Sequence, residues 1–171
     1  MQASLLLKRV LPLSLFLLAL DQASKWVVTR MFGLYEGVDV IPGFFSLLHV
    51  INKGASWGLL DGWAYSKYLL SVIAVLALAA LIVFRKAVFL PTQPWPAFTL
   101  ALLLGGIGGN LVDRVRIGGV TDFFHLYRGA YHFPIFNIAD VCISGGLVLY
   151  IIGQVVAERR AKRTACDDSA A

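Results

Sequence analysis

Cysteine and histidine are scarce in this 171-residue sequence, and their placement excludes several kinds of site. The two cysteines are Cys142, in an apolar stretch, and Cys166, in a polar tail. Two are too few for a disulfide framework, and we expect neither to be functional. The three histidines do not have metal-type spacing, and no His-Glu-x-x-His motif occurs. The sequence therefore predicts neither a metal site nor a cofactor.

The sequence also lacks internal repeats, low-complexity tracts and a basic stripe interleaved with exposed aromatic residues. The formal net charge of +5 could suggest a nucleic-acid partner. However, the densest basic run, Arg159 to Arg163, directly follows a long apolar stretch near the C-terminus. A cytoplasmic anchor beside a membrane explains that run better, so no nucleic-acid partner is expected.

Apolar residues are what the sequence has in excess. They make up 58% of the chain, and the mean hydropathy is +0.76. Soluble domains have roughly 45–50% apolar residues, and here these residues also fall into blocks. At 18.7 kDa there is room for one domain, so we expect residues 1–171 to form a single membrane-embedded unit.

Four stretches approach the roughly 20 apolar residues that a membrane-spanning helix needs. They are residues 10–30, 65–84, 95–113 and 136–157. The first could pass for a signal peptide, but no small-x-small cleavage site ends its apolar core. Instead, the polar run Asp21–Lys25 interrupts the core and Trp26–Val28 resumes it. We interpret this stretch as an uncleaved spanning helix.

Basic residues near the ends of the four spans predict their orientation. Lys8, Arg85 and the run at 159–163 fall on one side if the chain crosses four times. This clustering favours cytoplasmic termini. Residues 31–64 and 114–135 would then face outward, with a small β-hairpin formed by the runs at 38–41 and 44–50.

Polar and ionisable residues inside these spans recur at helical spacing. Such residues are costly in a bilayer, and they suggest a functional site by default. They are Asp21 and Lys25 in the first span, Asn110, Asp113 and Arg114 in the third, and Asn137 and Asp140 in the fourth. With the predicted topology all of them lie near the outer leaflet. Helix-to-helix bonding, and an interfacial pair between Asp113 and Arg114, remain the structural alternatives.

Asp122 and Asp140 differ from the other polar residues because neither has a cation three or four positions away. Asp122 is expected in the loop after the third span. If the two carboxylates face each other at close range, they cannot both ionise, and they share one proton. Such a pair supplies a base to activate water and an acid to protonate a leaving amine, the chemistry of peptide hydrolysis. From the residues alone, a structural role for this pair also stays open.

Other arrangements fit known chemistry less well. The run Gly54-Ala55-Ser56-Trp57 lacks the final glycine of a rhomboid-type serine motif, and it lies outside the spans. Ser24 and Lys25 are neighbours in sequence and therefore point about 100° apart on a helix, which excludes a serine–lysine pair. Four glycines, Gly105, Gly106, Gly108 and Gly109, indicate close helix packing in the third span.

Five motifs in order resemble those of bacterial lipoprotein signal peptidase (signal peptidase II, peptidase family A8). They are Asp21-Gln22-Ala23-Ser24-Lys25, Asn52-Lys53-Gly54-Ala55-Ser56-Trp57-Gly58, Gly109-Asn110-Leu111-Val112-Asp113-Arg114, Val120-Thr121-Asp122-Phe123 and Phe136-Asn137-Ile138-Ala139-Asp140. The resemblance covers nearly the whole chain. Lys53 and the pair Ser56-Trp57 depart from the residues frequent in the family.

The resemblance implies an aspartic endopeptidase with four transmembrane helices, a small extracytoplasmic β-cradle and a surface helix within 31–64. Asp122 and Asp140 would be the catalytic dyad. The residues that would line, brace or support the site are Asn52, Gly54, Asn110, Arg114, Asn137, Asp21, Lys25 and Asp113.

The resemblance also implies the partners and the location. The substrate would be a prolipoprotein that already carries diacylglycerol on its future N-terminal cysteine, cut just before that cysteine. The enzyme would lie among the lipids of the bacterial inner membrane, as a monomer without a cofactor, and globomycin-type cyclic peptides would inhibit it.

Two other classes compete with this interpretation. A small transporter or channel would use intramembrane charges as an ion path, but these charges cluster at one interface and no inverted repeat appears. A non-catalytic assembly factor would use the same polar faces to hold helices together.

Overall fold

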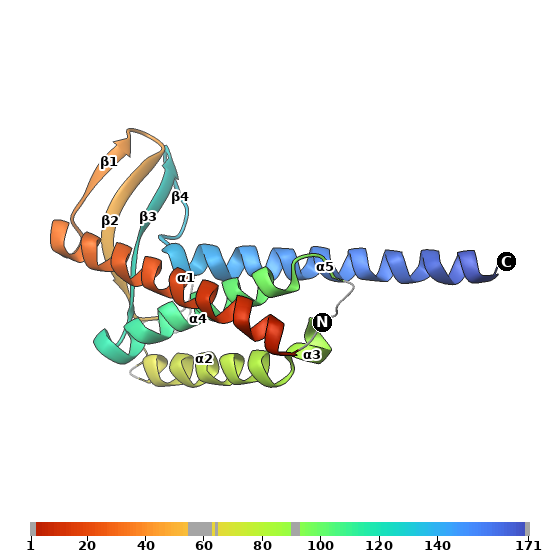
Figure 1. The fold of residues 1–171 in the computed structure, drawn as a ribbon. Helices are drawn as coiled ribbons and strands as arrows, with labels where there is room; N and C mark the ends of the chain where they lie inside the picture. Colours follow the sequence, from red (N-terminus) through yellow and green to blue (C-terminus); the bar gives the residue numbers. More distant parts are fainter. Residues whose placement is uncertain (1–2, 55–62, 64, 90–92, 170–171) are drawn as a thin grey trace.

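A computed structural model describes residues 3–54, 63, 65–89 and 93–169, except for the side chains of residues 3–7 and 164–169. Four long helices dominate it (Figure 1). They are α1 (Ala3–Met31), α2 (Ser66–Val83), α4 (Pro96–Ile117) and α5 (Ile138–Ser169), with a short helix α3 (Arg85–Val88) after α2. Each long helix contains a stretch that is long and apolar enough to cross a membrane, so the predicted fold class is confirmed.

The third helix extends further than the sequence suggested. We expected the span to end at residue 113. Instead α4 continues to Ile117 and ends at Gly118, whose φ of 74° is left-handed. The backbone N–H of Gly118 donates to the carbonyl oxygen of Arg114, which closes the last turn. Arg114 therefore lies within the helix, one turn before its end.

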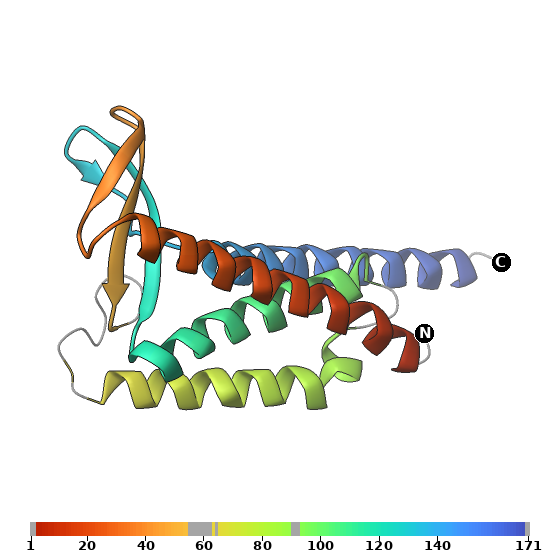
Figure 2. The same ribbon diagram turned by 60° about the vertical axis from the view of Figure 1, so that its left-hand side comes forward.

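The chain passes back and forth between two ends of the bundle. Helices α1 and α4 lead toward the β-sheet, while α2 and α5 lead away from it (Figures 1 and 2). The first turn of α1 and the last turn of α5 therefore both lie at the end opposite the sheet, and α5 projects beyond the other helices. The two termini lie on the same side of the bundle.

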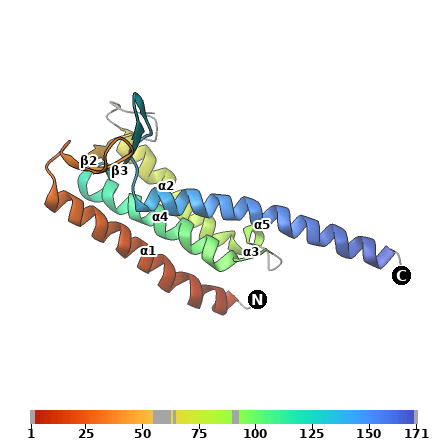
Figure 3. The same cartoon turned by 90° about the horizontal axis from the view of Figure 1, so that it is seen from above.

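Helix α4 is the central element, between α1 and α5 (Figure 3). Its glycines allow the neighbouring backbones to approach. A Cβ atom at Gly106 would lie 2.6 Å from the carbonyl oxygen of Ala139 in α5, and one at Gly109 would lie 2.5 Å from Oδ2 of Asp21 in α1. The predicted role of the glycine cluster in close helix packing is confirmed at these positions.

The outer faces of the helices remain apolar and exposed in the isolated chain. Leu15 in α1, Leu76 in α2 and Ile151 in α5 are each more than half exposed. Exposed apolar side chains in such numbers are costly in water and are expected where lipid tails cover them.

A four-stranded antiparallel sheet lies at one end of the bundle, in the order β1-β2-β3-β4. Its strands are β1 (Gly37–Ile41), β2 (Phe45–Asn52), β3 (Val120–Arg128) and β4 (Tyr131–His132). The predicted hairpin is confirmed as β1 and β2. The surface helix expected within 31–64 has no counterpart in residues 31–54, and residues 55–62 and 64 lie outside the described part of the chain.

The expectation that Asp122 lies in a loop was wrong, because this residue belongs to strand β3. The segment Val120–Phe124 is rich in β-branched and aromatic residues, which favour strands. It pairs with β2 so that Val50 lies opposite Asp122 and Asn52 lies opposite Val120. Strand pairing with β2 therefore fixes Asp122 on a regular backbone beside the start of α5.

The packing around α4 gives a test of the fold. Gly106→Ala is expected to destabilise the protein by about 1–3 kcal/mol, because the added methyl group meets the α5 backbone rather than a flexible side chain. Gly145→Ala is the matched control, since a Cβ at Gly145 would have no atom within 4 Å. Thermal unfolding in detergent measures both. Equal midpoints for the two variants would contradict the close α4–α5 packing.

Candidate active site

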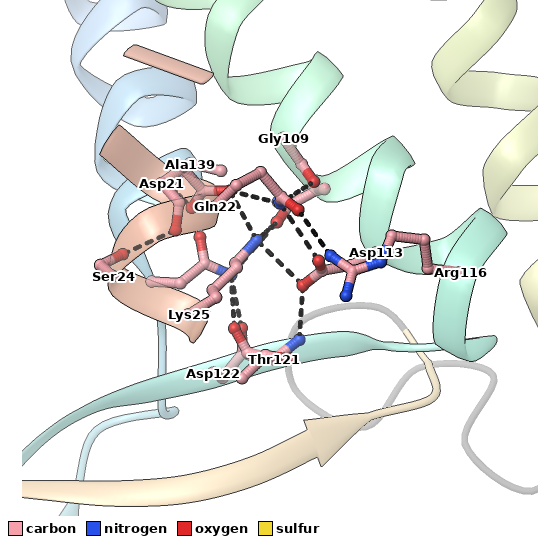
Figure 4. Close-up of polar contacts among 12 residues, drawn as sticks. Asp21, Gln22, Ser24, Lys25, Gly109, Asp113, Arg116, Thr121, Asp122 and Ala139 are labelled. Carbon is pink, nitrogen blue, oxygen red and sulfur yellow. Dashed lines mark hydrogen bonds and ion pairs between the residues drawn. The ribbon is translucent and has the colours of Figure 1, made fainter. Parts of the chain in front are cut away.

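The ammonium group of Lys25 is buried where α1 meets α4 near the sheet, and only 3% of the residue is exposed (Figure 4). Its Nζ lies 2.9 Å from Oδ2 of Asp21 and 3.2 Å from Oδ2 of Asp113. It also donates to Oδ1 of Asn110 at 3.0 Å. All three donors of the ammonium therefore have partners, as burial of a charge requires.

The two carboxylates bound to Lys25 also hold other elements. Oδ1 of Asp21 accepts a hydrogen bond from the backbone N–H of Ala139 at 2.9 Å, in the first turn of α5. Oδ2 of Asp113 accepts one from the backbone N–H of Thr121 at 3.0 Å, in β3. Four elements, α1, α4, β3 and α5, are thus joined through one buried cation and its two carboxylates.

Gln22 completes this cluster, although its role was not predicted from the sequence. Its Nε2 group lies 3.2 Å from Asp21 Oδ2, 3.1 Å from the carbonyl oxygen of Gly109 and 3.1 Å from Asp113 Oδ1. Its Oε1 accepts a hydrogen bond from Arg116 at 3.2 Å. The available signal was a second polar residue within the Asp21–Lys25 run of an otherwise apolar span.

The start of α5 is capped by a reciprocal pair of hydrogen bonds. The backbone N–H of Asp140 donates to Oδ1 of Asn137 at 3.0 Å, and the backbone N–H of Asn137 donates to Oδ2 of Asp140 at 3.1 Å. This is a capping box, with asparagine at the N-cap and aspartate three residues later. The carboxylate of Asp140 is thereby held at the mouth of the helix.

Asparagine amides link Asp140 to Asp122. Nδ2 of Asn137 donates to Oδ1 of Asp122 at 2.6 Å, and Nδ2 of Asn52 donates to Oδ2 of Asp122 at 3.0 Å. Nδ2 of Asn110 donates to Oδ1 of Asp140 at 2.8 Å. Each of the four carboxylate oxygens therefore accepts a hydrogen bond from an amide or backbone N–H, and no cation binds either carboxylate within the described residues.

Asn137 and Asn110 also connect this pair with the Lys25 cluster. Oδ1 of Asn110 accepts from Lys25 and from Nδ2 of Asn137, the latter at 3.2 Å. Asn137 is fully buried, so its orientation is fixed by its partners. Movement of the buried cation would therefore be transmitted to both aspartates through two amide groups.

Asp122 and Asp140 line one cavity of about 550 Å³. The other polar residues on its wall are Asn52, Asn110, Arg114 and Ser144. The apolar wall comes from the segment Phe133–Phe136 after β4 and from one face of α5, including Val141 and Val148. The cavity thus has a polar wall, which bears the two aspartates, and an apolar wall.

The pKa of Asp122 is raised to about 7. Burial is the larger cause, and the nearby charge of Asp140 is the second. The hydrogen bonds from Asn52 and Asn137 oppose this change but are smaller effects. Near neutral pH the pair therefore retains a proton that an exposed aspartate would have lost.

The structure brings together every candidate residue from the sequence analysis. Asn52, Gly54, Asn110 and Arg114 line the cavity with the two aspartates, and Gly54 donates its backbone N–H to Oδ1 of Asn52 at 3.0 Å. Asp113 is not simply paired with Arg114 at an interface. Its carboxylate binds Lys25, Gln22 and Thr121, because it faces the buried side of α4.

The Phe133–Phe136 wall was missed as part of the site. This segment approaches β3 through hydrogen bonds between the backbones of Phe124 and Phe136. Such a long-range pairing is set by the sheet, and no local pattern in the sequence indicates it.

Removal of the buried cation tests the cluster. Lys25→Met is expected to destabilise the protein by about 3–5 kcal/mol, because two buried carboxylates lose their counter-charge. Lys86→Met, at an exposed lysine, is the matched control. Thermal unfolding in detergent compares the two. A Lys25→Met midpoint equal to that of the control would contradict the assigned role of the ammonium.

Comparison with known proteins identifies the family of this chain. Residues 13–156 match the family model described as signal peptidase (SPase) II. The lipoprotein signal peptidase of Geobacter metallireducens is 39% identical over 144 residues, which are 84% of this chain and 88% of that protein. That of Symbiobacterium thermophilum is 35% identical over 150 residues, which are 86% of this chain and 95% of that protein.

Solved structures are also similar to this chain. A structure titled as a bacterial membrane enzyme at 2.3 Å resolution is similar with a TM-score of 0.72 and 32% identity, covering 85% of this chain and 87% of that one. A second, at 1.9 Å, has a TM-score of 0.69 and 32% identity, covering 84% and 90%. The relatives support a peptidase and not a transporter or channel. The chain belongs to the lipoprotein signal peptidase family, multi-pass bacterial membrane peptidases that process prolipoproteins.

Proposed function

We propose that Asp122 and Asp140 are the catalytic dyad of an aspartic endopeptidase, which cuts prolipoproteins just before a cysteine that carries diacylglycerol. The observation that carries this proposal is the shared cavity. A carboxylate from β3 and one from α5 line it, and the amide of Asn137 contacts both residues.

The proposed reaction needs one proton on the pair. The ionised carboxylate removes a proton from a water molecule, whose oxygen attacks the carbonyl carbon of the scissile peptide. The protonated carboxyl group hydrogen-bonds to the carbonyl oxygen as negative charge develops there. Collapse of the tetrahedral intermediate breaks the C–N bond, and a proton passes from the dyad to the leaving amine. The products are a carboxylic acid and a free amine on the cysteine.

Three residues on the cavity wall suit this chemistry. Burial and the charge of Asp140 keep a proton on Asp122 near neutral pH, which suits it to act as the general acid in the free enzyme. Asp140 lies at the positive end of α5, where a negative charge is favoured, which suits the base. The guanidinium of Arg114 supplies positive charge on the same cavity wall.

The proposal also places the site at the outer surface of the membrane. The dyad residues belong to β3 and to the first turn of α5, at the sheet end of the bundle and opposite the start of α1 and the end of α5 (Figure 1). With the termini in the cytoplasm, as the flanking basic residues favour, the cavity opens at the leaflet where a diacylglyceryl group would be anchored. Val141, Ser144, Gly145 and Val148 stand at positions i, i+3, i+4 and i+7 on one face of α5, and this face of the cavity wall offers a surface for acyl chains.

The same cavity accounts for the other expected partners. A globomycin-type cyclic peptide would compete for the dyad, because its polar backbone and apolar side chains suit the two kinds of wall. All the residues assigned to the reaction come from one chain, so a monomer would be sufficient.

The dyad gives a direct prediction. Asp122→Asn and Asp140→Asn are each expected to fold but to lower the rate of cleavage by at least about 100-fold, because an amide cannot supply the acid or the base. The measurement uses purified protein with a prolipoprotein that carries diacylglycerol, and an unlipidated substrate as the reference.

The matched control is Asp39→Asn, at a carboxylate on the sheet that contacts Tyr127 and lies outside the cavity. It is expected to retain activity. Substantial cleavage by either dyad variant would rule out the proposed roles. Equal cleavage of the unlipidated substrate by the wild-type protein would instead rule out the proposed lipid requirement.

The pH dependence gives a second prediction. The value of kcat/KM is expected to fall on the alkaline side with a midpoint near 7, because the dyad loses its proton as the pH rises through the pKa of Asp122. Asn52→Ala removes a hydrogen bond that favours ionised Asp122, so its alkaline midpoint is expected at higher pH. An activity that stays constant to pH 9 in the wild type, or a midpoint unmoved in Asn52→Ala, would contradict this assignment.

A further inference from the structure

A second cavity, of about 500 Å³, lies between the start of α2 and the end of α4. It is lined by Lys67, Tyr68 and Ser71 from α2, and by Arg114, Val115, Arg116, Ile117 and Gly118 from α4 and its C-cap. Arg114 is common to this cavity and to that of the aspartates. Arg116, which contacts Gln22 of the Lys25 cluster, also lines it, whereas neither aspartate of the dyad does.

The charge of this cavity is one-sided. Among the described residues, three cations line it, Lys67, Arg114 and Arg116, and no carboxylate does. The C-terminal end of a helix carries about half a negative charge. Even if the aspartates balance the charge of Arg114, the two positive charges of Lys67 and Arg116 exceed the partial negative charge at the end of α4.

The position of Lys67 is unusual for a structural cation. It is the second residue of α2, and the positive end of a helix dipole disfavours a cation there. Its ammonium lies 4.8 Å from the ring centroid of Tyr68, and within the described residues no carboxylate pairs with it. Its side chain reaches toward Gly118, where a Cβ atom would lie 3.9 Å from Nζ. The lysine thus crosses from α2 to the end of α4.

The depth of the cavity in the membrane indicates which class of ligand it would bind. Lys67 and Ser71 belong to the first two turns of α2, within about 10 Å of its start, and Arg116 belongs to the last turn of α4. In a spanning bundle this is the level of the lipid headgroups, where phosphate is the abundant anion. Exposed apolar residues further along α2, such as Val72 and Leu76, continue toward the lipid tails.

We propose that this cavity binds the phosphate group of an anionic phospholipid from the leaflet on the sheet side. Lys67 and Arg116 contact the phosphate, and the acyl chains lie against α2 and α4. A bound phosphate also lies beside Arg114, and this links the lipid composition of that leaflet to a residue on the wall of the aspartate cavity.

The test measures lipid binding to the purified full-length protein in neutral detergent, by native mass spectrometry and by thermal shift. Phosphatidylglycerol is expected to bind and to raise the unfolding temperature, whereas phosphatidylcholine has little effect. Lys67→Gln is expected to weaken phosphatidylglycerol binding about fivefold, and Lys67→Gln with Arg116→Gln about 25-fold. Since Arg116 also contacts Gln22, the single Lys67 variant keeps the test valid if the double variant unfolds.

The matched control is Arg30→Gln. Arg30 lies in the last turn of α1, which also ends at the sheet side, but contacts Trp26 and does not line the cavity. It is expected to bind phosphatidylglycerol as the wild type does. Equal binding by Lys67→Gln, or an equal loss in Arg30→Gln, would overturn the proposal. Inorganic phosphate is expected to bind far more weakly, and an affinity equal to that of the lipid would overturn the lipid assignment.

Discussion

The burial of the Lys25 ammonium is the constraint on which the rest of the site depends. A charge in this environment needs a full set of partners, and α1 supplies only Asp21. The others, Asp113 and Asn110, come from α4, so the two helices can pack only in one register. Because Asp21 also caps α5 and Asp113 also holds β3, the same register places the two elements that bear Asp140 and Asp122.

The four aspartates of this region fall into two chemically distinct pairs. Asp21 and Asp113 bind the ammonium group of Lys25, which makes them structural anchors. Asp122 and Asp140 accept hydrogen bonds from the amides of Asn52, Asn110 and Asn137 instead. Neutral donors orient a carboxylate without fixing its charge. Burial can then raise the pKa of Asp122, and that pair remains able to exchange a proton.

Glycine in α4 makes this arrangement possible. Gly109 leaves room for the carboxylate of Asp21 directly against the helix backbone, and Gly106 lets the start of α5 approach. Larger residues at these positions would separate α1 and α5 from α4. The polar cluster would then be open to lipid, where unsatisfied polar groups are costly.

Much of this could be predicted from the sequence, because its strongest signals are local. The length of the apolar stretches predicts the four helices. Helical spacing predicts that Asp21 shares a helix face with Lys25, and that Asn137 shares one with Asp140. The turn residues Pro42 and Gly43, between two short β-like runs, predict the first hairpin. These features depend on residues within a few positions of one another.

The features that could not be predicted from the sequence depend on contacts between residues far apart in the chain. Strand β3 was expected as a loop because its partner β2 lies about 70 residues earlier, so pairing rather than periodicity defines it. Asp113 points to Lys25 because of how α1 packs on α4, which spacing within the third span cannot show. The wall at Phe133–Phe136 likewise depends on pairing with β3. Tertiary contacts decided each of these cases.

The protonation state of the dyad is the most direct test of this account. Infrared spectroscopy of the purified protein from about pH 5 to pH 9 detects the C=O stretch of a protonated carboxyl group. We predict a band that disappears with a midpoint near pH 7 and is missing in Asp122→Asn. If no carboxyl band titrates in this range, or if the band persists in Asp122→Asn, Asp122 does not hold the shared proton and the central claim is wrong.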